Sequence, residues 1–352
     1  MINARTIYRE FTFNRPATTS RGTWLKKKVY YVLLNKSGDP STTGIGECSL
    51  LPGLSIDDTP GFPDQLNIMI NRINQGEEIA GSSLSDLPSL AFALETARND
   101  LRVAGSKLLY PSGFTEGKDS IRINGLIWMG QKDEMMKQIK QKLEDGFTCL
   151  KLKIGALNFE DELDLLRYLR KQYTSRELEI RVDANGAFKP GKALEFLKVL
   201  AGYDLHSIEQ PIPAGHMEAM AELCALSPLP IALDEELTGI HSIAAKKKLL
   251  ETIRPAYLVL KPGLLGGIAS CKEWIEISRE FNTDWWITSA LESNIGLNAI
   301  AQWTYTLNNP ISHGLSTGLL YASNIPSPLY LHCDRLYYDP DRNWNISDLT
   351  SV

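Results

Sequence analysis

Eight short apolar runs alternate with helical segments in the second part of this chain, and that alternation restricts the possible folds most strongly. The segments between the runs carry apolar residues at helical spacing, for example Ala193, Leu197 and Leu200. Strands that alternate with helices form a parallel sheet, and eight such units over roughly 200 residues favour an α/β fold of the (β/α)8 barrel type. The apolar runs are residues 121–127, 149–154, 179–184, 205–209, 230–233, 256–260, 284–288 and 311–315.

A doubly wound sheet is the competing architecture. Such a sheet usually has a glycine-rich phosphate loop after its first strand, and Asn124-Gly125-Leu126 does not form one. We therefore predict a catalytic barrel over residues 121–320 and an N-terminal α+β capping domain over residues 1–120. The C-terminal segment, residues 321–352, is expected to pack back on the capping domain.

The N-terminal region has the pattern of an antiparallel sheet followed by helices. Aromatic and β-branched residues in 7–13 and 29–34 predict two strands, and the polar residues 18–22 between them predict a mobile connection. A later helix is expected to begin near Asp86, with Pro88 in its first turn, and to end at Gly105.

Composition excludes several classes of partner. The net charge of −5 argues against nucleic acid or an anionic membrane as the main partner. No apolar run is long enough to span a bilayer, and we find no signal peptide. The five cysteines are odd in number and unpatterned, which predicts reduced packing residues in a cytoplasmic protein. Nothing in the sequence selects an oligomeric state.

Two lysines lie within the apolar run 149–154. Lys151 and Lys153 alternate with leucines, so both ammonium groups share one face of the predicted strand, about 7 Å apart. An exposed strand would tolerate them as a solvated face. A strand covered on both sides requires anionic partners for them.

Such partners follow at the ends of later runs. Asp183, Glu209, Asp234 and Lys261 are each separated by about one β/α repeat, so they converge at the carboxyl-end mouth of a barrel. Three adjacent buried carboxylates are costly, and a divalent cation relieves both their burial and their repulsion. Hard oxygen ligands in this number fit Mg²⁺. The alternative is three independent strand-end caps or salt bridges.

These motifs resemble those of the enolase superfamily, in its muconate-lactonizing subgroup, over nearly the whole chain. The resemblance implies that Asp183, Glu209 and Asp234 bind Mg²⁺, for which Mn²⁺ can substitute. It also implies that Lys153 and Lys261 are acid/base groups on opposite faces of a small carboxylate substrate. Loops near residues 15–24 and 47–55 are then expected to close over that substrate. The matching motifs are Lys151-Leu152-Lys153, Val182-Asp183-Ala184-Asn185, Ile208-Glu209-Gln210-Pro211, Leu233-Asp234-Glu235 and Leu260-Lys261-Pro262.

The chemistry of the resemblance agrees with the residue types. Removing a proton next to a carboxylate produces a dianion, which a divalent cation and nearby ammonium groups stabilise. Active sites of this superfamily are a well-known example of such stabilisation by Mg²⁺. Lys151 is expected to tune the site and contact the substrate carboxylate. Asn185 and Glu235 are expected to support the metal and the lysines.

Two further segments resemble o-succinylbenzoate synthases. They are Gly46–Ser55, which contains Leu51 and Gly53, and Ser289–Gly296, which begins with Ser289. The resemblance implies that Leu51, Gly53, Ser289 and Gly314 contact the substrate, with Ser289 and Gly314 near its succinyl tail. One departure is Ser316, where that family often has Asp before the threonine.

The expected activity is therefore dehydration of 2-succinyl-6-hydroxy-2,4-cyclohexadiene-1-carboxylate to o-succinylbenzoate, a menaquinone-pathway step. The main alternative is an N-acylamino acid or dipeptide racemase/epimerase of the same superfamily. Dipeptide epimerases usually carry an Asp-x-Asp motif in the last strand, and Leu315-Ser316-Thr317 lacks it. A cycloisomerase and a non-catalytic barrel are the remaining alternatives.

Overall fold

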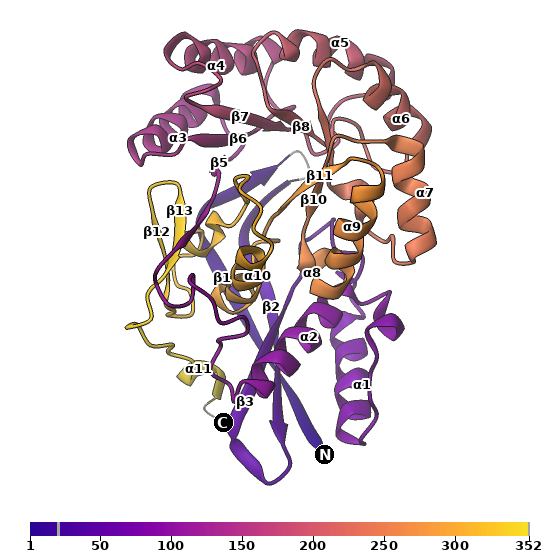
Figure 1. The fold of residues 1–352 in the computed structure, drawn as a ribbon, viewed down its shortest axis with the longest axis vertical. Coiled ribbons are helices and arrows are strands. Elements are labelled where there is room, and N and C mark those ends of the chain that lie inside the picture. The colour runs from indigo at the N-terminus through magenta and orange to yellow at the C-terminus, as the bar shows by residue number, and fades with distance from the viewer. Residues whose placement is uncertain (20–21, 351–352) are drawn as a thin grey trace.

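A computed structural model describes residues 1–19 and 22–350. It has an N-terminal antiparallel sheet, a curled parallel sheet surrounded by helices, and a C-terminal segment that returns beside the N-terminal strands (Figure 1). No helix in the described ranges is both long and apolar enough to cross a bilayer. All five cysteines are free thiols.

The N-terminal sheet has the order β1-β2-β3, formed by Ile2–Thr19, Gly22–Lys36 and Asp39–Ser49. Its strands are longer than predicted. Of the expected mobile connection at 18–22, Thr18 and Thr19 belong to β1 and Gly22 to β2, and Thr19 pairs with Gly22. Residues 20 and 21 lie outside the described ranges. Helices α1 (Phe62–Asn74) and α2 (Pro88–Arg102) follow, and Pro88 is in the first turn of α2 as predicted.

Helix α2 packs very closely on β3. A Cβ atom at Gly46 would lie 1.8 Å from the carbonyl oxygen of Ala93, so only glycine allows this approach. The contact fixes the end of β3, from which the loop at 50–55 continues toward the parallel sheet.

The parallel sheet has seven strands in the order β11-β10-β9-β8-β7-β6-β5. The predicted first strand is wrong as a single unit, because residues 121–127 divide into β4, which pairs with the C-terminal strand β13, and β5. Pairing with two different partners breaks the run at Ile123 and Asn124. The sheet strands are β5 (Gly125–Ile127), β6 (Cys149–Lys153), β7 (Glu179–Asp183), β8 (Ser207–Glu209), β9 (Ile231–Leu233), β10 (Tyr257–Leu260) and β11 (Asp284–Ile287).

The last predicted strand, residues 311–315, is not a strand within the described chain. Only isolated parallel bridges occur there, from Thr288 to Gly314 and from Ile123 to His313. These two bridges join the segment to both edges of the seven-stranded sheet. His313 supports it, because its Nδ1 accepts a hydrogen bond from the Ile287 N–H, at 3.0 Å.

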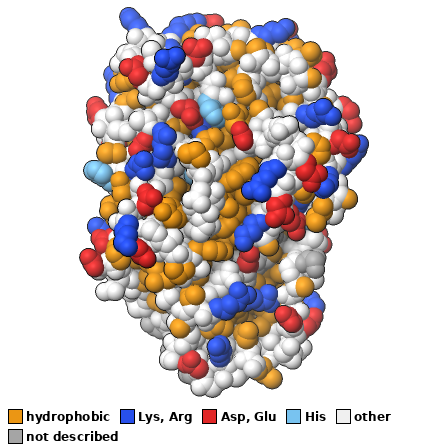
Figure 2. All heavy atoms as spheres, viewed as in Figure 1, with side chains coloured by type: hydrophobic (Ala, Val, Ile, Leu, Met, Phe, Trp, Pro, Cys, Tyr) orange, Lys and Arg blue, Asp and Glu red, His pale blue; other side chains and the backbone are white. Residues whose placement is uncertain are grey.

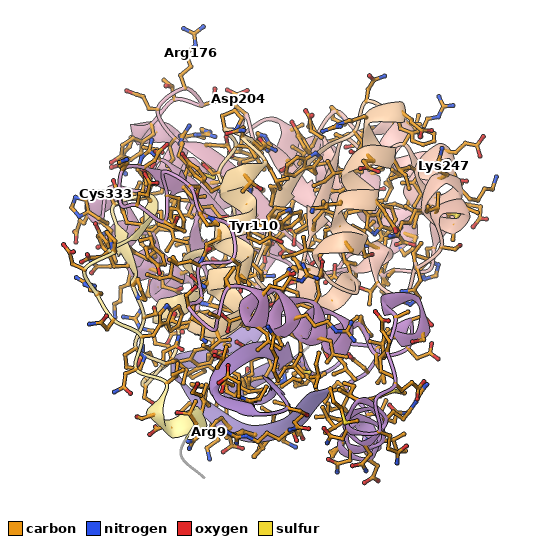
Figure 3. The ribbon with its side chains drawn as sticks, turned by 60° about the horizontal axis from the view of Figure 1, so that its bottom comes forward. Arg9, Tyr110, Arg176, Asp204, Lys247 and Cys333 are labelled. Atoms are coloured by element: carbon orange, nitrogen blue, oxygen red, sulfur yellow. The ribbon has the colours of Figure 1, made fainter. Side chains whose placement is uncertain are left out.

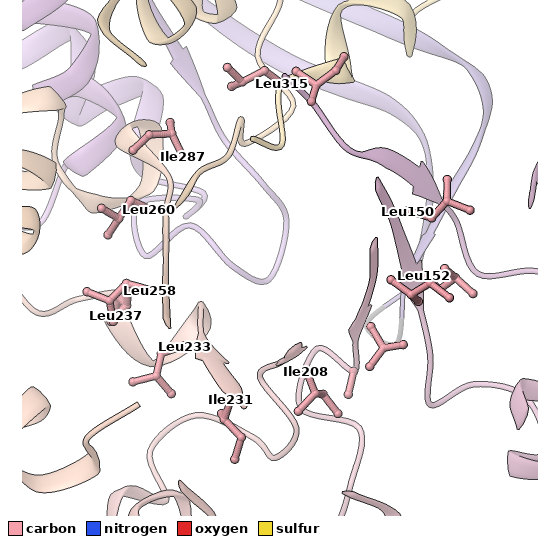
Figure 4. Close-up of a cluster of buried hydrophobic side chains, with 14 of the residues drawn as sticks. Leu150, Leu152, Ile208, Ile231, Leu233, Leu237, Leu258, Leu260, Ile287 and Leu315 are labelled. Atoms are coloured by element: carbon pink, nitrogen blue, oxygen red, sulfur yellow. The ribbon is translucent and has the colours of Figure 1, made fainter. Parts of the chain in front are cut away.

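Helices cover the outer face of the curled sheet. They pack on alternate strand residues such as Leu150, Ile208 and Leu258, which form a ring of buried hydrophobic side chains around the strands (Figure 4). The inward residues of the same strands are different in kind, and they include the charged side chains predicted from the sequence. The helices are α3 (Lys132–Glu144), α4 (Phe159–Gln172), α5 (Pro190–Ala201), α6 (Met217–Leu226), α7 (Ile243–Ile253), α8 (Pro262–Leu265), α9 (Ile268–Glu280) and α10 (Asn294–Thr306).

The C-terminal segment contacts both parts of the chain. Strand β13 (Arg335–Tyr338) pairs with β12 (Leu329–His332) and with β4 (Ser120–Arg122), while helix α11 (Ser347–Thr350) lies beside β1. There, the Arg9 guanidinium donates to the Asp348 carbonyl oxygen, and Figure 3 shows Arg9 next to this helix. Acidic and basic side chains are interspersed on the face shown in Figure 2.

Candidate active site

The inward charged side chains of the curled sheet form one buried group, the strand-end cluster, made of Lys151, Lys153, Asp183, Glu209, Asp234 and Lys261. Pairing of Lys153 with Asp183, and of Asp183 with Glu209, sets three neighbouring strand ends at the same level. Every member of the cluster is at most 8% exposed. The cluster therefore has to neutralise its charges internally.

Lysines link the carboxylates of the strand-end cluster. The Nζ atom of Lys151 lies 2.8 Å from Asp183 Oδ2 and 2.5 Å from Glu209 Oε2. Lys153 Nζ lies 2.6 Å from the same Asp183 oxygen. The third lysine of the cluster, Lys261, pairs through its ammonium group with Asp234.

The surrounding polar residues orient these pairs. Asn185 accepts a hydrogen bond from Lys153 Nζ at 2.7 Å and donates from Nδ2 to Glu235 Oε1 at 2.9 Å. Its backbone has φ 43°, a left-handed conformation that Asn tolerates, and its N–H donates to Asp183 Oδ1. Asn185 thus connects the Lys153 side of the cluster with Glu235.

Burial and the neighbouring charges shift the acidities in opposite directions. Burial opposes ionisation of Asp183, but Lys151 and Lys153 outweigh it and hold the pKa of Asp183 well below its usual range. Burial, together with the Asp183 carboxylate, raises the pKa of Glu209 to about 8. Burial alone would lower the pKa of Lys261, yet the Asp234 and Glu209 carboxylates raise it overall.

The residue types fit a divalent cation. Glu209 Oε1 is buried and has no hydrogen-bond partner among the described residues, so this carboxylate can still accept a positive ligand. Within residues 1–19 and 22–350, however, no three acidic, histidine or cysteine side chains are already gathered at metal-binding distances. Lysine ammonium groups stand between the carboxylates instead, and they supply the positive charge there.

A pocket of about 100 Å³ lies over this cluster. Its wall includes Lys151, Lys153 and Lys261, whereas Asp183, Glu209 and Asp234 lie behind them. Of the other predicted residues, Leu51, Asn185, Glu235, Ser289 and Gly314 also line the pocket. Gly53 does not; it is exposed in the turn next to Leu51, with φ 71°.

Several pocket residues were not predicted individually as substrate contacts. Asn124, Leu126, Thr288 and Leu291 come from the parallel sheet and the segment after it, whereas Trp24, Pro52 and Leu54 lie in the two segments that were expected to close over the substrate. Trp24 lies within the predicted closing loop 15–24, but it is part of strand β2. The inward alternation of Asn124 and Leu126 was the available signal, and it was hidden because the strand is broken there. Ser316 also lines the pocket.

Ser289 lines the pocket, but its hydroxyl group is already engaged in a hydrogen bond to a carboxylate. Its Oγ donates to Glu292 Oε2, and its N–H donates to the Gly314 carbonyl oxygen at 3.0 Å. The Gly314 N–H donates to the Ile287 carbonyl oxygen at 2.9 Å. These hydrogen bonds build the pocket wall and occupy the backbone donors of both residues.

A second buried charged group, the seam cluster, joins the N-terminal sheet to this wall and consists of Lys27, Glu47 and Glu292. Glu47 accepts hydrogen bonds from the Ser293 N–H at 2.7 Å, from Ser293 Oγ at 2.6 Å and from the Gly296 N–H at 2.8 Å. The Lys27 ammonium donates to the Ala290 carbonyl oxygen. The seam cluster thereby holds the start of α10 and the segment after β11.

Comparisons with known proteins agree with this geometry. The family model described as "Enolase C-terminal domain-like" matches residues 134–333. The o-succinylbenzoate synthase of Desulfotalea psychrophila is 44% identical, with the alignment covering 91% of this chain and 94% of the relative. The crystal structure of MenC from Desulfotalea psychrophila superposes with a TM-score of 0.82 at 40% identity, covering 96% of this chain and 99% of that one.

A more distant structure shares the fold. The dipeptide epimerase from Cytophaga hutchinsonii, complexed with Mg and the dipeptide D-Ala-L-Val, has a TM-score of 0.77 at 17% identity, covering 98% of this chain and 96% of that one. Together with the family match and the relative at 44% identity, the curled sheet and its buried strand-end charges lead to one conclusion: the chain belongs to the enolase superfamily and, within it, to the o-succinylbenzoate synthase family.

Proposed function

We propose that this protein is an o-succinylbenzoate synthase that dehydrates 2-succinyl-6-hydroxy-2,4-cyclohexadiene-1-carboxylate. The observation that carries the proposal is the 44% identity to a protein of that name over 91% of this chain. The opposed lysines Lys153 and Lys261, both on the wall of one pocket, support it. We assign the reaction to menaquinone biosynthesis in the cytoplasm.

In the proposed reaction Lys153, as the neutral amine, removes the proton at C1 of the ring. The C1–H electron pair first moves onto the ring carboxylate, which gives an enediolate, and then returns to form the C1–C6 double bond as the C6–O bond breaks. The proton now on Lys153 goes to the departing hydroxide, which leaves as water. The ring becomes aromatic, and the product is o-succinylbenzoate. Lys261 stays protonated on the opposite side and stabilises the negative charge that develops on the substrate carboxylate.

We propose that Asp183, Glu209 and Asp234 hold Mg²⁺, with Mn²⁺ as a substitute. When bound, the cation supplies Lewis-acid stabilisation of the substrate carboxylate. With Lys153 as the neutral amine, the strand-end cluster has two ammonium and three carboxylate groups, so it carries one negative charge in excess. A divalent cation then adds the positive charge that a substrate with two carboxylates requires, and the unpartnered Glu209 oxygen supports its binding. Asn185 and Glu235 keep Lys153 oriented.

We further propose the division into a capping domain (1–120), a catalytic (β/α)8 barrel (121–320) and a C-terminal segment (321–352). The bridges of Thr288 and Ile123 to the segment at His313–Gly314 support an eighth barrel strand position. Pocket contacts of Trp24, Leu51 and Leu54 support a capping role for the first domain and substrate contact for the loop that includes Gly53.

The direct test is turnover of the cyclohexadiene substrate with Mg²⁺, followed by the absorbance of the aromatic product. Chelation with EDTA should abolish turnover, and Mg²⁺ or Mn²⁺ should restore it. Asp234→Asn should lose cation binding by calorimetry while keeping its circular dichroism spectrum. Full turnover after dialysis against EDTA would contradict the metal assignment. Rapid α-proton exchange of N-succinylamino acids in D₂O without dehydration would favour a racemase instead.

A further inference from the structure

The floor of the pocket contains a buried amide without a hydrogen-bond partner for its oxygen. Asn124 is 3% exposed and lines the pocket together with Lys151 and Lys153, and its Oδ1 has no hydrogen-bond partner among the described residues. Leaving a buried polar atom unpaired costs free energy, because the atom has lost its hydrogen bonds to water. Rotation of the amide presents either its oxygen or its N–H₂ to the pocket. A ligand group that pairs with Asn124 would recover this cost.

Strand register gives the depth of Asn124. Leu126 pairs with Lys151, and Asn124 precedes Leu126 by two residues, so both side chains lie on the inward face. Asn124 is therefore one layer deeper than Lys151. Its N–H donates to the His313 carbonyl oxygen at 2.9 Å, which fixes it next to the segment that continues with Gly314.

A second unpaired group flanks the same segment from the other side. Thr288 bridges to Gly314, lines the pocket, and has a buried Oγ1 with no hydrogen-bond partner among the described residues. A Cβ atom at residue 314 would lie only 2.6 Å from Thr288 Oγ1 and 2.8 Å from its Cγ2. Only glycine at position 314 therefore leaves room for the Thr288 side chain beside it.

The other donors at this corner are engaged. The N–H groups of Ser289 and Gly314 are bonded to carbonyl oxygens of neighbouring strands, and the Ser289 hydroxyl is bonded to Glu292. Among the described residues, Asn124 and Thr288 are thus the neutral pocket-lining side chains of this corner with unpaired buried atoms. Both can donate a hydrogen bond, which suits an acceptor oxygen of a ligand.

We propose that Asn124 and Thr288 are positioning residues that together bind an oxygen of the substrate's succinyl tail, across Gly314. This inference rests on the proposed function, in which the ring carboxylate lies at the lysines and the succinyl tail is left to extend toward Gly314. The tail carries two sources of an acceptor oxygen, its ketone and its terminal carboxylate. Holding one of them fixes the rotation of the ring so that the C1 proton faces Lys153.

The test measures binding of three probes by calorimetry at saturating Mg²⁺. The probes are o-succinylbenzoate, 2-butanoylbenzoate, which lacks the terminal carboxylate, and 4-(2-carboxyphenyl)butanoate, which lacks the ketone. The variants are Thr288→Val and Asn124→Leu, which keep side-chain volume and remove the hydrogen-bonding groups. We expect each variant to weaken o-succinylbenzoate roughly 3- to 100-fold, the range for one lost hydrogen bond.

The probe that lacks the recognised oxygen should bind to wild type and to the variants with the same affinity. The identity of that probe shows whether the ketone or the terminal carboxylate is recognised. Thr288→Ser keeps the hydroxyl and should restore most of the affinity. In turnover, KM should rise while kcat changes less. Thr283→Val is the matched control, because the Thr283 hydroxyl is bonded to the Pro255 carbonyl oxygen at the other end of β11, away from the pocket.

Equal weakening of all three probes, or no weakening of any, would overturn this proposal and leave Asn124 and Thr288 with a structural role. If wild type still dehydrates the substrate in either case, the proposed function is not contradicted. Absence of dehydration by wild type would instead overturn the proposed function itself, so the two failures are distinguishable.

Discussion

The strand-end cluster and the seam cluster are both buried, but they neutralise their charges by different means. In the strand-end cluster Asp183 and Glu209 pair mainly with ammonium groups at the ends of flexible lysine side chains, and one backbone N–H, that of Asn185, donates to Asp183. In the seam cluster Glu47 is held by two backbone N–H groups and one hydroxyl group. The first set of partners is free to rearrange, whereas backbone donors are fixed by helix α10.

This difference distinguishes a reactive site from a structural one. Charges that pair mainly with other side chains can exchange those partners for a cation or a substrate, at little cost to the fold. A carboxylate that caps the start of a helix also benefits from the helix dipole, and moving it would release that helix. We therefore expect substitutions in the strand-end cluster to change rates, and substitutions in the seam cluster to change stability.

The largest expected effect is on rate. Lys153→Ala should lower kcat for dehydration by roughly 10²–10⁴-fold, because it removes a positioned proton-transfer group. Its unfolding midpoint in urea should stay close to that of wild type. Lys261→Arg is the matched variant, because it keeps the positive charge but is too basic to transfer protons, and it should retain part of the activity. A Lys153→Ala enzyme with more than a tenth of wild-type kcat would contradict the assignment.

The next effect is on stability. Glu47→Ala removes the acceptor for three buried donors and should lower the free energy of unfolding by roughly 2–4 kcal/mol, measured by urea denaturation. Glu47→Gln keeps one acceptor oxygen and should lose about half as much. Activity of the folded fraction should fall far less than in Lys153→Ala. A large loss of kcat without loss of stability would remove the contrast between the two clusters.

The strand-end residues could be predicted because they depend on local pattern. Asp183 and Glu209 each end an apolar run, and the β/α repeat brings such ends together whatever the rest of the chain does. The same reasoning placed Lys151 and Lys153 on one inward face. It did not show which lysine pairs with which carboxylate.

Other features depend on contacts that no local pattern contains. Glu47 and Ser293 are 246 positions apart, so the anchoring of the pocket wall could not be inferred from either segment alone. The prediction of one strand over 121–127 was wrong because β4 pairs with the C-terminal β13. For the same reason the inward position of Asn124 was not recognised. The last predicted strand is reduced to isolated bridges at His313 and Gly314, since only a few backbone hydrogen bonds join this segment to its neighbours, such as Ser289 N–H to the Gly314 carbonyl oxygen.

A third prediction concerns the protonation of His313, a buried side chain that belongs to neither cluster. Burial, with Arg181 nearby, lowers the pKa of His313 from 6.5 to about 4. The unfolded chain therefore binds a proton between these values that the folded protein does not, so stability is fully present above pH 6.5 and is lost as pH falls toward 4. The loss is at most about 3.5 kcal/mol, because each pKa unit corresponds to about 1.4 kcal/mol.

The measurement is the free energy of unfolding from pH 7 to pH 4 for wild type and for His313→Gln. The glutamine side chain can accept the hydrogen bond from the Ile287 N–H but does not titrate. As pH falls, the free energy of unfolding should decrease more for wild type than for the variant. A pH-independent difference would show that His313 does not titrate across this range.

The smallest expected effect concerns the loop between the two clusters. The N–H groups of Leu54 and Ser55 both donate to the Leu51 carbonyl oxygen, at 3.0 Å and 2.9 Å, so this turn is already folded over the pocket. Leu51 and Leu54 line the pocket, and burying them against a ligand should reduce local opening. We expect hydrogen exchange at these two amides to slow about tenfold when o-succinylbenzoate and Mg²⁺ are present at several times their Kd. Amides of the seam, such as Ser293 N–H, should change less because Glu47 holds them in both states.

Leu54→Ala is the matched variant, since it removes the pocket contact but keeps the backbone hydrogen bonds. It should lose most of the ligand-dependent slowing. Equal slowing at the loop and the seam would mean that ligand binding suppresses only global unfolding, and that this loop does not act as a lid.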